Sequence, residues 1–160
     1  MADLLQFSKN IRRRGRQIEN SASELVRSMA KRTLRSLVQN TKADTGKARS
    51  NWRVGLGAAP TAVIDPYSPY PKGSKANGRG AAETANAAAA IAAGNARINS
   101  VKGVSGVGLK TAVYITNNVP YLDKALQPGA IEVSIREAQA VVRGFRVFDR
   151  NSGGDEGGDL

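Results

Sequence analysis

A seven-residue apolar repeat near the start of the chain limits the folds open to it. The repeat consists of large apolar residues seven positions apart, with further apolar residues between them: Leu4, Phe7, Ile11, Ile18, Ala22, Leu25 and Met29. This spacing places an apolar stripe on one face of an α-helix, opposite a face rich in Arg and Lys. It predicts a helix over residues 4–40, about 50 Å long.

Such a helix is longer than a compact domain of this size needs. Either residues 1–20 project as a helical arm, or the helix breaks near residue 20. A break would fall at Gly15 or at the capping-box pattern Ser21-x-x-Glu24. We expect the projecting helix.

The rest of the chain predicts short strands and two more helices. Trp52, Val54 and Leu56 alternate with smaller or polar residues, as a half-buried strand does, and residues 109–116 repeat the pattern. Four prolines in residues 58–75 predict an irregular loop. The alanine-dense residues 81–96 predict a helix that ends at Gly94.

Residues 130–144 predict the last helix, with five residues available for the core: Val133, Ala138, Val141, Val142 and Phe145. The fold class expected is α+β. A small, mostly antiparallel sheet is packed by the long N-terminal helix and the C-terminal helix, with an alanine-rich helical insertion. We expect residues 1–150 to form a single domain and residues 151–160 to be a flexible acidic tail rich in glycine.

The chain contains no His and no Cys, which removes imidazole catalysis, thiolate nucleophiles, disulfides and the usual zinc ligands. The carboxylates outside the tail show no ligand-like clustering. Asp44-Thr45-Gly46 occurs once, whereas an aspartic-protease site needs two such carboxylates. The glycine-rich residues 103–111 lack the Lys directly after the second defining Gly that a phosphate-binding loop requires. We therefore predict neither an enzyme nor a cofactor or metal site.

The net charge of +11 is concentrated near the N-terminus. Residues 1–53 hold thirteen Lys and Arg against four Asp and Glu, whereas residues 149–160 have a net charge of −3. The densest basic cluster is a candidate contact for a partner: Lys9, Arg12, Arg13, Arg14 and Arg16. The partner is either an acidic protein surface or DNA phosphates, and the lack of aromatic residues between the cations disfavours stacking on single strands. A solubilising surface is the simpler alternative. No apolar run is long enough to cross a bilayer.

Two short motifs carry a family resemblance. The first is Asp44-Thr45-Gly46 followed by Trp52, and the second is the sequence VYITNNVPY at residues 113–121. Their order and spacing between helices resemble the tail-completion and neck proteins of tailed bacteriophages, a group that includes minor tail protein Z of lambda. The matching positions are Asp44, Thr45, Gly46, Arg49, Ser50, Trp52, Tyr114, Ile115, Asn117, Asn118, Pro120, Tyr121 and Gly129. Residues 125–128 depart from the family pattern.

The resemblance implies a structural virion protein that forms a ring at the head–tail junction, assembled in the host bacterial cytoplasm. Its partners would be other copies of itself, six or a multiple, together with neighbouring neck, connector or tail proteins. The DNA in the channel is a further candidate partner. The motif residues would then have structural roles, chiefly Asp44, Thr45, Gly46, Trp52, Asn117, Asn118, Pro120 and Tyr121. A nucleic-acid-binding protein that uses the basic cluster is the alternative.

Overall fold

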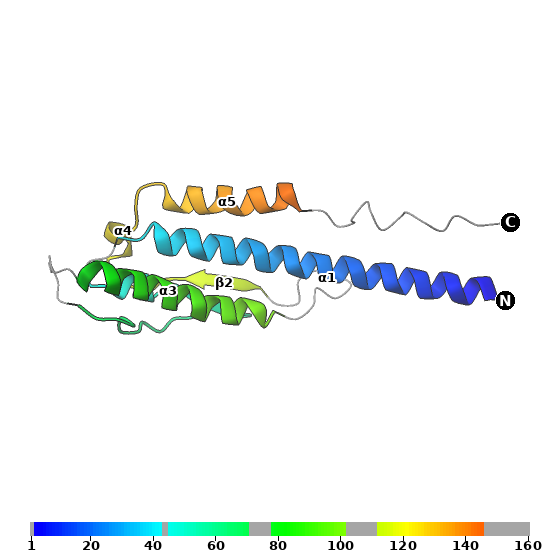
Figure 1. The fold of residues 1–160 in the computed structure, drawn as a ribbon, viewed down its shortest axis with the longest axis horizontal. Helices are drawn as coiled ribbons and strands as arrows, with labels where there is room; N and C mark the ends of the chain where they lie inside the picture. Colours follow the sequence, from blue (N-terminus) through cyan, green and yellow to red (C-terminus); the bar gives the residue numbers. More distant parts are fainter. Residues whose placement is uncertain (1, 43–44, 71–77, 102–111, 146–160) are drawn as a thin grey trace.

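A computed structural model describes residues 2–42, 45–70, 78–101 and 112–145. The elements in chain order are α1 (Ala2–Gln39), α2 (Lys47–Ser50), β1 (Arg53–Leu56), α3 (Gly78–Asn99), β2 (Val113–Thr116), α4 (Leu122–Ala125) and α5 (Ala130–Gly144). α1 lies in the middle, with α5 on one side and α3 and the strands on the other (Figure 1). The α+β fold predicted from the sequence is confirmed.

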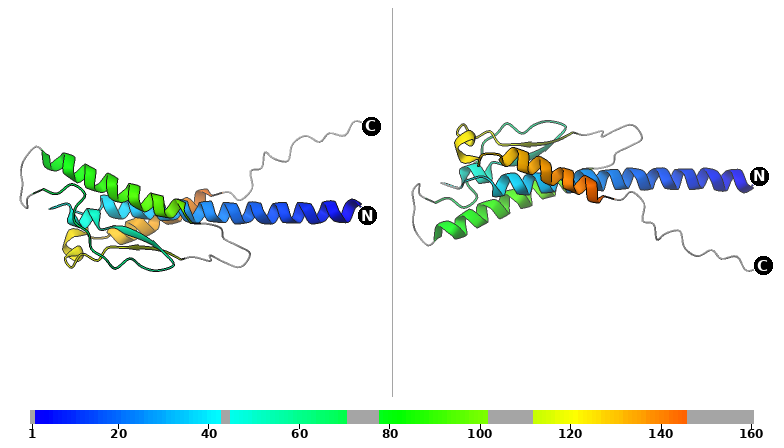
Figure 2. Two further views of the ribbon diagram at one scale, coloured as in Figure 1. Left: turned by 90° about the horizontal axis from the view of Figure 1, so that it is seen from below. Right: turned by 90° about the horizontal axis from the view of Figure 1, so that it is seen from above.

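α1 is one continuous helix of 38 residues, with no break at Gly15 or Ser21. Polar side chains add hydrogen bonds to carbonyls in its last turn. Asn40 Nδ2 donates to the Ser36 carbonyl at 2.9 Å, and Thr41 Oγ1 donates to the Leu37 carbonyl at 2.7 Å. The N-terminal half of the helix extends well beyond the other described elements in all three views (Figures 1 and 2).

The strands form a two-stranded antiparallel sheet. Val54 lies opposite Ile115, and Leu56 lies opposite Val113. Both strands fall where the alternation predicted them, although residues 109–111 of the second prediction lie outside the described residues. An isolated bridge between Thr41 and Leu126 ties the end of α1 to the segment before α5.

α3 does not end at Gly94, as the sequence predicted, but continues to Asn99. A Cβ on Gly94 would lie 2.3 Å from Leu34 Cδ2, so this glycine permits the close approach of α3 to α1. The side chain of Arg27 in α1 donates from Nε and one terminal nitrogen to the Val101 carbonyl, at 3.2 and 2.6 Å. The glycine therefore serves packing, and the contact with Arg27 holds the chain just beyond the end of α3.

The core lies between α1, α3 and the sheet. Its buried members are Ala30, Leu34, Leu37, Val38, Trp52, Val54, Ala90 and Ile98. The indole Nε1 of Trp52 donates to Thr41 Oγ1 at 2.8 Å, so its one polar atom is satisfied inside the core.

α5 packs on α1 through small side chains, namely Ala130, Ser134 and Ala138. The prediction that Val133 and Val142 belong to the core is wrong, because their exposed fractions are 37% and 45%. Apolar side chains occupy a wider part of the circumference of α5 than the part that packs against α1. Arg32 in α1 and Glu137 in α5 form an ion pair at 3.0 Å beside this contact.

Candidate interaction surface

The part of α1 that extends beyond the body exposes large apolar side chains. We call residues 4–20 the arm, and Leu4, Phe7, Ile11 and Ile18 the arm stripe. Their exposed fractions are 76%, 64%, 55% and 49%. From residue 4 onward, the first buried residue of α1 is Ser23, so the arm contributes no buried side chain to the core. Exposed apolar residues that recur along one side of a helix are typical of a surface that another chain covers.

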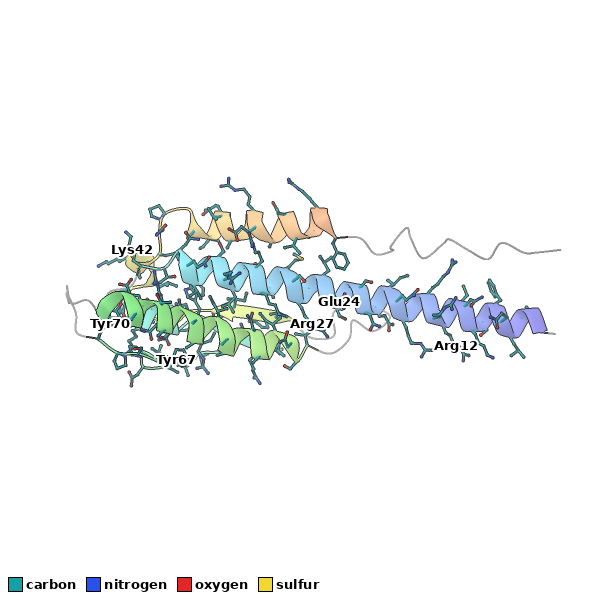
Figure 3. All side chains as sticks on the ribbon, viewed as in Figure 1. Arg12, Glu24, Arg27, Lys42, Tyr67 and Tyr70 are labelled. Carbon is teal, nitrogen blue, oxygen red and sulfur yellow. The ribbon has the colours of Figure 1, made fainter. Side chains whose placement is uncertain are left out.

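The five predicted contact residues all lie on the arm and are exposed: Lys9, Arg12, Arg13, Arg14 and Arg16. Figure 3 shows Arg12 far from the body and Glu24 close to the end of α5. At 3.6 residues per turn, four of the five point away from the arm stripe, and we call this group the basic face: Lys9, Arg12, Arg13 and Arg16. Arg14 differs, because the same geometry places it next to the arm stripe.

The first motif lies at the junction of α2 and the sheet. Gly46 is the residue before α2 and has a φ of +80°, which favours glycine. Arg49 Nε donates to the Thr41 carbonyl at 2.7 Å. Trp52 is buried, whereas Asp44 lies outside the described residues. The motif thus connects the end of α1 to the sheet.

Two buried asparagines organise the proline-rich loop, and the sequence analysis missed both. Asn86 Oδ1 in α3 accepts from Ser50 Oγ at 2.9 Å and from the Ser68 amide at 2.8 Å, while its Nδ2 donates to the Ser68 carbonyl. Asn51 exchanges a similar pair of hydrogen bonds with the backbone of Ile64. An Asn among alanines on α3 was the available signal.

The second motif fastens the end of β2 to the loop and to α2. Asn117 Nδ2 donates to the Ala48 carbonyl at 2.7 Å, and Asn118 Nδ2 donates to the Pro60 carbonyl at 2.7 Å. Tyr121 precedes α4, and its backbone carbonyl accepts from the amides of Lys124 and Ala125. Pro120 and the ring of Tyr121 are exposed. The asparagines and the tryptophan of the two motifs thus contact neighbouring elements, whereas the proline and the tyrosine ring face solvent.

α5 carries a second exposed apolar strip, which the sequence analysis also missed. Ile131, Ile135 and Val142 have exposed fractions of 53%, 50% and 45% and fall on one side of the helix. The width of the apolar arc on this helix was the signal, because it exceeds what one neighbouring helix covers.

Two surface grooves accompany these features. One of about 730 Å³ lies between β1, the loop that follows it and α3, with Arg53, Tyr67 and Arg97 among its lining residues. The other, of about 370 Å³, lies between α1, α3 and α5 and is lined by Lys31, Arg32 and Arg35. Among the residues that the structure describes, no group of three or more acidic residues is placed to hold a metal ion. The glycine-rich residues 103–111 lie outside this part of the chain.

Within the same described ranges, no helix is long and apolar enough to cross a membrane. Comparisons with protein-family models, curated proteins and solved structures find no match to this chain. The features that bear on function are therefore the arm, the strip on α5 and the two motifs.

Proposed function

We propose that this chain is a structural subunit of a tailed-bacteriophage virion. It forms a ring at the head–tail junction that completes the tail and joins it to the neck. The order and spacing of the two motifs support this assignment through the family resemblance. The observation that carries it is the arm, a helix that displays apolar side chains beyond a body with a core of its own.

A ring explains why one chain has two separate apolar surfaces. In a head-to-tail ring, one patch of each subunit contacts a different patch of the next. The arm stripe and the strip on α5 are two such patches on different helices. Full burial of a Leu, Ile or Phe side chain contributes about 1.5–3 kcal/mol, so covering the arm stripe contributes about 4–7 kcal/mol before the costs of association. One contact of this size is weak, but a closed ring gives each subunit two.

The test is the assembly state of the purified chain, measured by native mass spectrometry and negative-stain imaging. We expect closed rings of six subunits or a multiple, the number that the family resemblance implies. Ile11→Glu with Ile18→Glu should prevent ring formation without changing the circular dichroism of the body. Gln6→Glu with Gln17→Glu adds the same charge on exposed positions away from the arm stripe, and this control should still assemble. A chain that stays monomeric at high concentration and is absent from virions would refute the proposal.

Nucleic-acid binding is the second candidate, because all four cations of the basic face are exposed. Binding through several phosphates falls steeply with salt, by about 0.9 log units per phosphate for each tenfold increase. Ring assembly through apolar contacts lacks this dependence. Titration of a DNA duplex at several salt concentrations therefore separates the two candidates.

A further inference from the structure

We propose that the basic face is the docking surface for the acidic C-terminal segment of the same chain, residues 149–160. The arm carries five cations and one acid, Glu19, for a net charge of +4. Residues 149–160 carry four acids and one Arg, for a net charge of −3. Opposite charges of similar size on one chain are the first argument for this contact.

The direction of α5 is the second argument. α5 runs antiparallel to α1, toward the arm (Figure 1). The ion pair between Arg32 and Glu137 fixes the alignment of the two helices. Gly144 lies seven residues after Glu137, so the end of α5 is opposite about residue 25 of α1.

The length of chain beyond α5 is the third argument. The basic face begins at Arg16, about 14 Å along α1 from residue 25, and ends at Lys9, about 24 Å from it. An extended chain spans at most about 3.3–3.6 Å per residue. Asp149 is five residues beyond Gly144 and Asp159 is fifteen, so their reaches are about 17 and 50 Å. The acidic residues of the segment can therefore reach the part of α1 that carries the four cations.

The groove lined by Lys31, Arg32 and Arg35 is the competing basic surface. It lies alongside α5 itself, so the chain beyond Gly144 would have to reverse its direction to enter it. Arg32 is already paired with Glu137. The basic face needs no reversal, and no salt bridge is seen at any of its four cations with an acid of the described residues.

The chemistry of residues 149–160 also selects a face of the arm. The segment contains one large apolar residue, Leu160, and four glycines. It can neutralise cations but cannot cover the arm stripe. Docking therefore masks the basic face from other polyanions and leaves the arm stripe open for a neighbouring subunit. A tether of only a few residues gives an effective concentration in the millimolar range, so weak exposed ion pairs suffice for partial occupancy.

The absence of cysteine makes disulfide trapping a direct test. In the full chain, Asn20→Cys with Ser152→Cys places one thiol on the side of the basic face. Gly15→Cys with Ser152→Cys is the control on the arm-stripe side, where a new side chain meets open space. At low salt we expect the Asn20 pair to form an intrachain disulfide several times faster than the Gly15 pair. Because Asn20 is also nearer to residue 25, about 8 Å along α1 against about 15 Å for Gly15, the ratio of the two rates near 1 M salt is the reference for distance alone. Equal rates for the two pairs, or a cross-linked dimer as the product, would overturn the proposal.

Neutralising the acidic residues of the segment provides the second measurement. Neutralising the segment with Asp149→Asn, Asp155→Asn, Glu156→Gln and Asp159→Asn should lower the low-salt preference for the Asn20 pair to the ratio measured near 1 M salt. The same full-length variant should bind a DNA duplex about tenfold more tightly at low salt, and screening should remove the difference near 1 M salt. Unchanged affinity for the duplex would contradict masking of the basic face. Neither measurement depends on ring formation, so this inference and the proposed function can fail separately.

Discussion

The contact between α1 and α3 at Gly94 allows a stability prediction in which two known effects oppose each other. Replacing a glycine in the interior of a helix by alanine stabilises the helix by about 1 kcal/mol. At Gly94 the new Cβ would lie 2.3 Å from Leu34 Cδ2 and 3.1 Å from Val54 Cγ2, two atoms of the core. Forcing an extra methyl group into a packed core typically costs about 1–3 kcal/mol. We therefore expect Gly94→Ala to lower the free energy of unfolding by up to about 2 kcal/mol.

Urea and thermal unfolding followed by circular dichroism measure this change, which corresponds to a melting temperature lower by up to about 8 °C. Gly80→Ala, in the same helix, is the matched control because its Cβ meets open space. It should raise stability by up to about 1 kcal/mol. The two substitutions are chemically identical, so their opposite signs isolate the contact with α1.

A double-mutant cycle then identifies the atom responsible. Leu34→Val removes the methyl group that conflicts with the new side chain and alone costs about 1 kcal/mol for the lost methylene, plus any cavity term. Combined with Gly94→Ala, it should cost less than the sum of the single changes by about 1–2 kcal/mol. A stabilising Gly94→Ala, or a coupling energy of zero, would refute the reasoning that Gly94 is required by helix packing.

Three further predictions concern the first motif and the basic cluster. Gly46→Ala should lower the melting temperature by more than Gly129→Ala does. Both glycines have a positive φ, but only at Gly46 would a new Cβ meet the Asn86 side chain, at 2.2 Å. Equal losses in thermal unfolding would contradict this prediction. Trp52→Phe should lower the free energy of unfolding by at least about 1 kcal/mol, because the hydrogen bond to Thr41 is lost, and Trp52→Ala should lower it by about 3–5 kcal/mol. If both variants melted like the wild type, Trp52 would not be part of the core. The third change reverses four cations of the arm to Glu, namely Arg12, Arg13, Arg14 and Arg16. It should change the free energy of unfolding by no more than about 0.5 kcal/mol per substitution and yet block incorporation into particles, as tested by complementation of infectivity. Full complementation would reduce these residues to a solvated surface.

Local patterns were sufficient to predict most of the secondary structure. The seven-residue repeat predicted α1, and the alternation around Val54 and Ile115 predicted both strands. The last helix has the predicted bounds, Ala130–Gly144. These predictions succeed because period and propensity act over a few neighbouring residues, whose preferences agree with the final packing.

The errors arose where a residue responds to a distant part of the chain. The residues around Gly94 predict a helix end, but its role is to make room for Leu34, sixty positions earlier. Val142 reads as core, but whether it is buried depends on which side of α5 contacts α1. The sequence shows Asn86 as one polar residue in an alanine-rich helix, yet it makes two hydrogen bonds to Ser68 of the proline-rich loop and one to Ser50 of α2. Sequence spacing does not encode these long-range partners.

The local preferences of the arm also bear on its function, because they oppose a free helix. Lys9 with Arg13 and Arg12 with Arg16 are like charges four residues apart, which destabilise a helix, and Gly15 in the middle of the arm adds about 1 kcal/mol. A helical segment of this length without tertiary contacts is marginal in water. The arm therefore gains most of its stability when its cations are neutralised and its apolar stripe is covered. Hydrogen exchange should consequently be fast in residues 4–20 of the isolated subunit and slow in the ring, and equal protection in the two states would show that the arm is not an assembly contact.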